Sequence, residues 1–363
     1  MKNSSRKNKI IHREKIYGVD IGKSGVKIAL LFKNQEKNIM LENLTYQDFP
    51  IYIDSLKNTT VVQTIREAIS KLEVETERIK AVVNLYGTEP VIKFLTLPHM
   101  PEDELNKTIR WQAQKHIIYD LEKMIIDYAI LNTFEEMGVK KISLVLAATM
   151  KETIINQLEI LKEANIEPVA IDVDCLAQFY LAREKGILNT TDSVCILDIG
   201  AKNAVIQIID NGIPRFRREC INIGASEINK AIKETLKVSW EDAEKIKREF
   251  SLSSLEMENN GEDKVKGIIK KVIEDAIIEI KRSLDYYIDI SPQKSVECIF
   301  LTGGGALLGH LDLYLKQQLG IKVEKLDPFK DVVFSEKIKD IKYAQNNSLR
   351  FVTAMGLALE AIL

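Results

Sequence analysis

Hydrophobic and polar positions alternate in two segments of the chain that share one pattern. In residues 19–30 and again in residues 197–208, an apolar run ends in Asp-Ile-Gly, a short polar turn follows, and apolar residues then occupy every second position. This pattern predicts two strands joined by a tight turn with a carboxylate at its mouth. Because each copy opens one half of the chain, we expect a duplicated fold that holds a ligand between its halves.

The remaining apolar runs and helical periodicities predict an α/β protein. Residues 90–164 stand apart, because their predicted order of strand, helix, strand, strand and helix describes a compact insertion in the first half. Several predicted helices in a row indicate a helical lobe in the second half. Expected strands cover residues 16–19, 26–32, 79–85, 91–95, 125–131, 142–147, 169–173 and 296–301, and expected helices cover residues 58–72, 151–164, 175–185, 225–235, 240–250, 265–287, 307–319 and 348–362, with another that begins near residue 102.

Composition excludes several classes of protein. The chain has 363 residues, of which 45% are hydrophobic and 29% charged, and its formal net charge of -2 offers no overall basic surface for nucleic acid. No apolar run approaches the roughly 18 residues that span a membrane. The four cysteines lie far apart in or beside apolar runs, so we expect buried free thiols in a reducing compartment rather than disulfides or a metal site.

A third feature is the run Gly303-Gly304-Gly305, which lies between a predicted strand and a predicted helix. Glycines there let the backbone approach a flat or charged ligand at a helix N-terminus, although close packing of the chain on itself would also select them. The run lacks the later glycine of a dinucleotide fingerprint and the Gly-Lys-Ser/Thr of a P-loop. These two nucleotide folds are therefore not expected.

The order Asp-Ile-Gly, Asp-Ile-Gly, Gly-Gly-Gly resembles the two phosphate motifs and the adenosine motif of the actin-like ATPase superfamily. Within that superfamily, the chain is similar to the PilM family of type IV pilus assembly proteins, a close relative of the cell-division protein FtsA. The similarity runs from about residue 17 to the C-terminus. It rests on further segments at residues 94–101, 127–128, 146–152, 243–247, 279–287 and 326–329.

The resemblance implies an actin-like, ribonuclease H-like duplicated fold of two domains, with a small α/β subdomain inserted in the first and a helical nucleotide-binding lobe in the second. Residues 1–15 are polar and basic, and we expect a disordered tail there or, alternatively, a segment that lies on an anionic membrane surface. The expected boundaries are residues 16–89, 165–192 and 348–363 for the first domain, 90–164 for the insertion, 193–224 and 294–347 for the second domain, and 225–293 for the lobe.

The resemblance also implies ATP and Mg²⁺ between the two turns. Asp20 and Asp198 would hold the Mg²⁺ through water, and backbone N–H groups of both turns would contact phosphate. Lys27 would either neutralise phosphate or stand as a solvated lysine on its strand. The implied cofactor-binding residues are Asp20, Gly22, Lys23, Ser24, Gly25, Lys27, Asp198, Gly200, Lys202, Asn203, Glu244, Lys247, Arg282, Gly303, Gly304 and Gly305.

Other implied roles also have alternatives. Glu244 and Lys247 lie three residues apart on one predicted helix and would contact the ribose and adenine or form a surface ion pair. Arg282 would flank the adenine or lie on a helix surface. Asp172 and Asp174 precede the first connecting helix, where the superfamily places a water-orienting Glu or Gln, and would take that catalytic role or cap the helix. Their short side chains predict slow hydrolysis.

The function implied is that of a cytoplasmic ATP-binding protein, with weak ATPase activity at most, in the inner-membrane assembly platform of a type IV pilus. Its partner would be the cytoplasmic N-terminal tail of PilN, which would hold it at the inner face of the membrane without insertion; self-association is a further option. Residues 91–111 are the expected wall of the peptide groove, with Trp111 lining it or packed in a core. An FtsA-like filament protein and a small-molecule kinase of the same superfamily are the alternatives.

Overall fold

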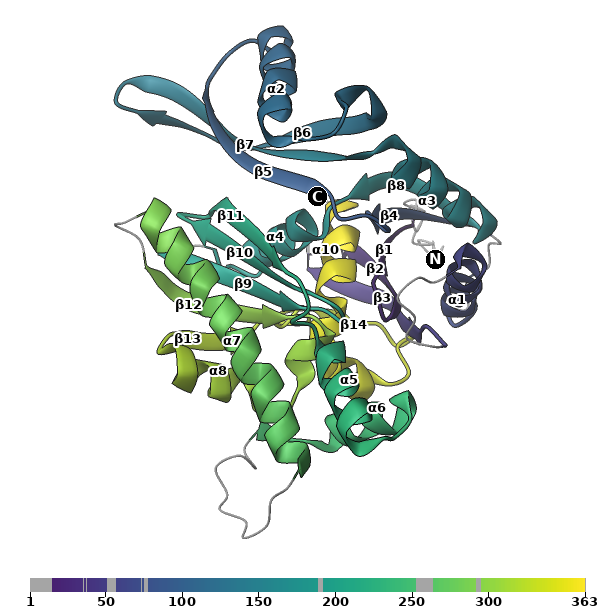
Figure 1. Ribbon diagram of the computed structural model, residues 1–363. Helices are drawn as coiled ribbons and strands as arrows, with labels where there is room; N and C mark the ends of the chain where they lie inside the picture. The colour runs from purple at the N-terminus through teal and green to yellow at the C-terminus, as the bar shows by residue number, and fades with distance from the viewer. Residues whose placement is uncertain are drawn as a thin grey trace, which may run out of the picture.

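Figure 1 shows the computed structural model, an α/β protein with two large sheets and a third, smaller sheet at the top of the view. The structure describes residues 15–34, 36, 38–50, 57–72, 74, 78–188, 192–252, 264–291 and 295–362. The expected tail, except for Lys15, lies outside these ranges, as do residues 253–263.

The two large sheets repeat one arrangement. In the first, β1 (Ile16–Ile21), β2 (Gly25–Lys33) and β3 (Ile39–Asp48) form an antiparallel meander, and β4 (Ile79–Asn84) lies parallel to β1 on its other side. In the second, β9 (Ser193–Ile199), β10 (Ala204–Asp210) and β11 (Ile213–Cys220) repeat the meander, and β12 (Val296–Thr302) lies parallel to β9. The expected duplication is confirmed. The outer strands are β8 (Ile166–Asp172) and β14 (Val333–Phe334) in the first sheet and β13 (Lys322–Lys325) in the second.

Two helices, α4 (Asp174–Glu184) and α10 (Val352–Glu360), pack against each other at the centre of the molecule. A Cβ at Gly18 of β1 would overlap the backbone of Ala354, and a Cβ at Gly356 would overlap the backbone of Ala177. Glycine at these two positions therefore permits the close approach of strand to helix and of helix to helix. Residues 352–359 of α10 are all buried, so this helix is covered on every side rather than along one apolar stripe.

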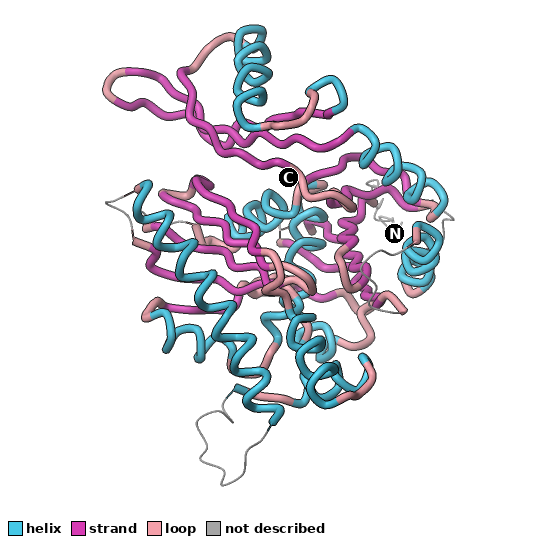
Figure 2. Tube along the Cα trace, viewed as in Figure 1, coloured by secondary structure: helices cyan, strands magenta, loops and turns pink. Residues whose placement is uncertain are grey.

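The helices α1 (Asn58–Ser70) and α3 (Lys151–Glu163) lie side by side against the first sheet (Figure 2). Ile160 and Leu161 of α3 share a buried core with Ile65 of α1 and with residues of β1 and β2. Helix α3, which the sequence pattern assigned to the insertion, therefore contributes to the core of the first domain.

The insertion has a sheet of three antiparallel strands in the order β5 (Val91–Pro98), β7 (Val139–Met150) and β6 (Met124–Glu136). Helix α2 (Glu102–His116) packs Leu105, Ile109 and Ala113 into the core of this subdomain. Trp111 is 55% exposed, and the Lys115 ammonium lies over its ring, 3.3 Å from the ring centroid. The alternative that placed Trp111 in a core is therefore wrong.

In the second domain, α7 (Lys264–Ile290) and α8 (Leu311–Leu319) pack on the sheet, and α5 (Ala225–Leu236) and α6 (Trp240–Glu249) form the lobe beside it. Helix α8 begins later than residue 307, because a 3-10 turn (Gly304–Leu307) and the left-handed His310, with a φ of 61°, precede it. The remaining short elements are α9 (Ile341–Asn346) and 3-10 turns at Leu121–Lys123 and Ser348–Phe351. The four cysteines are buried and free, as expected. Within the described ranges, no helix is long and apolar enough to cross a membrane.

Candidate functional site

A cleft of about 670 Å³ lies between the two domains and brings together most of the residues implicated by the sequence. Both Asp-Ile-Gly turns, the glycine run and helix α6 line it. The sequence-predicted residues that line the cleft are Asp20, Gly22, Lys23, Ser24, Lys27, Asp174, Asp198, Gly200, Lys202, Asn203, Glu244, Lys247, Gly303, Gly304 and Gly305.

The first turn joins β1 to β2 and positions a buried ion pair. Gly22 N donates a hydrogen bond to Gly25 O at 3.0 Å, which closes the turn. Asp20 and Lys27 are partners across the two strands, so the Lys27 ammonium lies 3.1 Å from the Asp20 carboxylate, and each side chain is only 10% exposed. A Cβ at Gly22 would stand 2.6 Å from that ammonium. The alternative of a solvated Lys27 is wrong.

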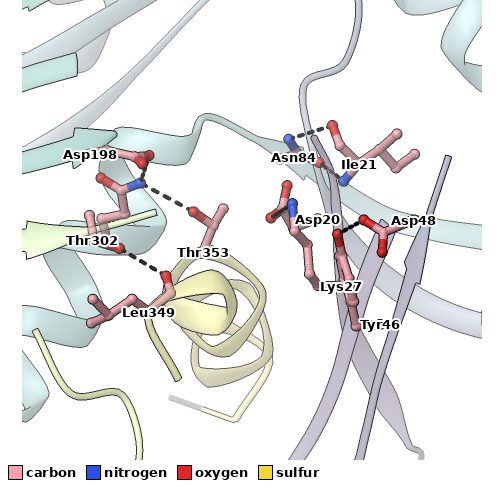
Figure 3. A network of polar contacts seen from close by, with 11 residues as sticks. Asp20, Ile21, Lys27, Tyr46, Asp48, Asn84, Asp198, Thr302, Leu349 and Thr353 are labelled. Atoms are coloured by element: carbon pink, nitrogen blue, oxygen red, sulfur yellow. Dashed lines mark hydrogen bonds and ion pairs between the residues drawn. The ribbon is translucent and has the colours of Figure 1, made fainter. Parts of the chain in front are cut away.

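The second turn has the same backbone but different neighbours. Gly200 N donates to Asn203 O at 3.0 Å, matching the bond of the first turn. Gln178 of α4 donates from Nε2 to Asp198 at 2.6 Å and to Thr353 of α10 at 3.2 Å. Figure 3 labels these two acceptors, Asp198 and Thr353. Burial raises the pKa of Asp198, and the nearby charge of Asp20 acts in the same direction. The second carboxylate is therefore held by an amide rather than by a cation.

A third carboxyl group, Asp174 at the start of α4, stands in the same cleft. Burial raises its pKa to about 8, and the charges of Asp20 and Asp198 reinforce the shift. Asn84, at the end of β4, hydrogen-bonds to Asp174 and also accepts a 2.7 Å hydrogen bond from the backbone N–H of Ile21. Burial and the two neighbouring carboxylates therefore favour the protonated form of Asp174 near neutral pH.

The glycine run packs closely against the second turn. Gly303 has a φ of 86°, and a Cβ there would overlap a carboxylate oxygen of Asp198 and the carbonyl of Ile199. A Cβ at Gly305 would overlap the side chain of Ile199. A Cβ at Gly304 would meet only Arg350, at 3.7 Å or more. Only glycine fits at residues 303 and 305, which explains two of the three glycines.

Helix α6 presents a compact ionic cluster to the cleft. The Glu244 carboxylate accepts hydrogen bonds from Lys247 at 2.6 Å, Arg248 at 2.7 Å and Asn229 at 2.6 Å. Although burial alone would raise it, the pKa of Glu244 falls to about 2 because these partners stabilise the charged form, with Lys247 foremost. Burial lowers the pKa of Lys247. Both side chains line the cleft, so the pair is more than the surface ion pair of the alternative interpretation.

Three predicted residues are not among those that line the cleft. Gly25 lies within β2, where a Cβ would overlap the carbonyl of Gln47 in β3. Arg282 is 67% exposed on α7 and pairs with Glu279 at 2.5 Å, so its helix-surface alternative describes it. Asp172 lies beside Glu360. Burial raises the pKa of Asp172, and its hydrogen bond with Glu360 acts in the opposite direction. The capping alternative is also wrong, because the N-cap of α4 is Val173 and no side chain caps that helix.

Sequence reasoning missed several residues that shape the cleft. Gln178 and Asn84 orient the carboxylates, and Arg350 stacks over the Tyr46 ring, 5.0 Å from its centroid. Asn84 ends a buried strand, which is a recognisable position for a polar site residue. Gln178 lies four residues after Asp174, so helical periodicity alone puts the two on one face of α4.

The cleft fits a hydrated divalent cation better than a bare one. Among the residues that the structure describes, no three His, Cys, Asp or Glu side chains converge closely enough to hold a metal ion by themselves. The charges of Asp20 and Asp198 nevertheless help to raise the pKa of Asp174, and the charge of Asp20 helps to raise that of Asp198, effects that a cation beside these carboxylates would relieve. Mg²⁺ keeps several waters and accepts one or two carboxylates, which agrees with this arrangement.

The duplicated fold, with its cleft between two Asp-Ile-Gly turns, is an actin-like fold. More narrowly, the chain belongs to the family of type IV pilus assembly protein PilM, whose family model matches residues 18–362. Neither a cell-division filament protein nor a small-molecule kinase is favoured by this match.

Solved structures support the same fold. A structure described as the PilM–PilN type IV pilus biogenesis complex is similar over 97% of this chain and 99% of that chain, with a TM-score of 0.82 and 24% identity. The ethanolamine utilization protein EutJ from Carboxydothermus hydrogenoformans covers 96% of this chain and 90% of its own, at a TM-score of 0.54 and 16% identity. MreB 5 of Spiroplasma citri bound to AMPPNP covers 96% of each chain, at 0.52 and 11%.

Proposed function

We propose that this protein binds ATP with Mg²⁺ in the interdomain cleft. The observation that carries the proposal is the convergence of both Asp-Ile-Gly turns and the glycine run on one cleft. Backbone N–H groups of the two turns and the side chains of Lys23 and Lys202 would contact phosphate, and Glu244 and Lys247 would contact the ribose and adenine. The similar fold of MreB 5, which is described with bound AMPPNP, supports a nucleotide as the ligand.

Mg²⁺ would lie between Asp20 and Asp198 and supply charge neutralisation at the phosphates. Asp174, rather than Asp172, would face the attacking water, because only Asp174 lines the cleft. The aspartate side chain is shorter than the Glu or Gln that the superfamily places here, so it orients that water less well. We therefore expect turnover slower than about 1 per second, well below that of typical enzymes.

Thermal melting with and without Mg-ATP tests the binding site. A ligand at a hundredfold excess over its Kd stabilises the folded state by about 2.7 kcal/mol. The double substitution Asp20→Ala and Asp198→Ala is expected to abolish the shift, whereas Asp103→Ala, at an exposed carboxylate on α2, is the matched control that keeps it. An unshifted wild type, or an equal shift in the double variant, contradicts the proposal.

We further propose that the protein acts in type IV pilus assembly at the inner face of the membrane, held there by the cytoplasmic N-terminal tail of PilN. Membership of the PilM family and the likeness to a PilM–PilN complex support this partner. The insertion, with the exposed Trp111 on α2, is the proposed recruitment surface. Binding of a labelled PilN tail peptide, measured by fluorescence anisotropy for the wild type and Trp111→Ala, tests it; an unchanged affinity would move the peptide site away from α2.

A further inference from the structure

Residues 85–90 connect β4 of the first domain to β5 of the insertion, and we call them the connecting segment. Tyr86, Gly87 and Thr88 line the interdomain cleft on one side. On the other side they line a second cavity of about 510 Å³, shared with the N-terminal half of α3. No residue of this segment is fully buried. Tyr86 packs against the core of the first domain, and its backbone N–H donates to Gln157 of α3 at 3.1 Å. Residues 87–89, which follow it, are exposed, so their position depends on polar contacts.

One of these contacts comes from the first turn. The Lys23 ammonium donates to the carbonyl of Gly87 at 3.0 Å. Burial lowers the pKa of Lys23, and the charge of Lys202 in the second turn acts in the same direction. An anion between the turns would relieve this repulsion, and its charge-assisted bond to Lys23 would be stronger than a bond to a neutral carbonyl. Anion binding thus competes with the connecting segment for one ammonium.

A second contact comes from the other domain. Glu89 forms an ion pair with Arg217 of β11. The same strand reaches the second turn through Glu219, which accepts a 2.5 Å hydrogen bond from Asn203. It also reaches the insertion through Arg215, which donates to Thr96 at 3.1 Å and to Ser143 at 3.2 Å. Strand β11 therefore contacts both the cleft and the insertion.

Arg217 is not fully satisfied in this position. Its Nε is buried without a hydrogen-bond partner among the described residues. Gln207 lies opposite Arg217 on the neighbouring strand and is 1% exposed. Neither the nitrogen nor the oxygen of its side-chain amide has a hydrogen-bond partner among the residues that the structure describes. Buried polar groups without partners cost free energy. A second position of Arg217 that satisfied them would therefore compete with the present one.

We propose that the connecting segment couples anion binding in the cleft to the position of the insertion. Phosphate draws Lys23 away from Gly87, and the movement of the segment that follows alters the Glu89–Arg217 ion pair. For the natural anion, a nucleotide, the inference rests on the proposed function. The consequence is a partner-binding subdomain whose position depends on the nucleotide state.

Amide hydrogen exchange of residues 85–98 in the full chain tests this. In the absence of ligand, Lys23→Gln is expected to raise exchange several-fold over wild type, whereas Lys33→Gln, on the same strand pair, leaves it unchanged. Mg-AMPPNP is expected to raise it in wild type in the same way. If Lys23→Gln exchanges like wild type, the proposal is overturned without reference to any ligand.

Arg217→Gln is expected to keep the melting shift with Mg-AMPPNP but to lose the exchange response of β5. Arg218→Gln is the matched control, because this neighbour pairs instead with Glu279 of α7. A response of β5 that persists in Arg217→Gln overturns the role of β11. A wild type that melts higher with Mg-AMPPNP but shows no exchange response overturns this inference alone, whereas a wild type without a melting shift overturns the proposed nucleotide site.

Discussion

The two Asp-Ile-Gly turns have the same backbone and different electrostatics. Seven residues after each aspartate, the first copy has Lys27 and the second has Val205, and both face the aspartate across the hairpin. Asp20 is therefore paired with a cation on its own hairpin, whereas Asp198 depends on Gln178 from another helix. Figure 3 shows the two carboxylates on opposite sides of the cleft. Duplication preserved the turn and let the charge balance diverge.

The largest expected effect comes from removing the cation of the first turn. Lys27→Met leaves a nearly buried carboxylate without its partner, which costs about 3 kcal/mol of unfolding free energy. Gln178→Met leaves Asp198 without an amide donor, which costs about 1–3 kcal/mol. Chemical denaturation of the two variants compares the turns directly. Equal losses would show that the amide and the cation are equivalent partners.

A second test breaks the second turn through its backbone. Gly303→Ala introduces a Cβ that overlaps Asp198 at a positive φ, so we expect a loss of about 2–3 kcal/mol. Gly304→Ala is the matched control, because its Cβ meets only the flexible Arg350 side chain. Urea denaturation midpoints of the two variants should therefore differ clearly. Similar midpoints would mean that the glycine run can shift away from the turn at little cost.

The sequence predicted the half of the site that is local. Both turns, the glycine run and the Glu244–Lys247 pair follow from short patterns, and the hairpin register alone brings Lys27 opposite Asp20. For Arg282 the sequence left two roles open, and the structure agrees with the helix-surface one: Ile280, Ser283 and Leu284 are buried, which turns residue 282 outward. Gln178 could not be assigned to Asp198, because that contact joins a helix to a strand of the other domain.

The difference between Asp172 and Asp174 also required the tertiary structure. The two residues flank the change from β8 to α4, and the change of backbone sends one carboxyl toward Glu360 and the other into the cleft. The inserted helix α3 shows the same limit. The order of elements placed it in the insertion, whereas Ile160 and Leu161 pack in the core of the first domain.

The smallest expected effect, when taken per pH unit, concerns pH, and it separates a carboxyl group in the cleft, Asp174, from one outside it, Glu360. Asp174 binds its proton far more tightly in the folded state, with a pKa of about 8, than in the unfolded chain, where an aspartate pKa is about 3.9. Between these values the unfolded state releases a proton that the folded state retains, so stability falls as the pH rises, by at most about 1.4 kcal/mol per pH unit. Above pH 8 the penalty is complete.

Asp174→Asn is expected to remove this slope and to stabilise the protein at pH 7 and above. Glu360 is the comparison outside the cleft, because burial and Asp172 raise its pKa to about 8 as well. Glu360→Gln should likewise remove part of the fall in stability with rising pH. A cation in the cleft, however, can reduce only the part of this pH dependence that is due to Asp174. Melting temperatures of wild type and both variants from pH 5 to pH 9, with and without Mg-ATP, make the distinction. If Mg-ATP flattens the pH dependence of Asp174→Asn as much as that of Glu360→Gln, the charge that the ligand neutralises is not that of Asp174.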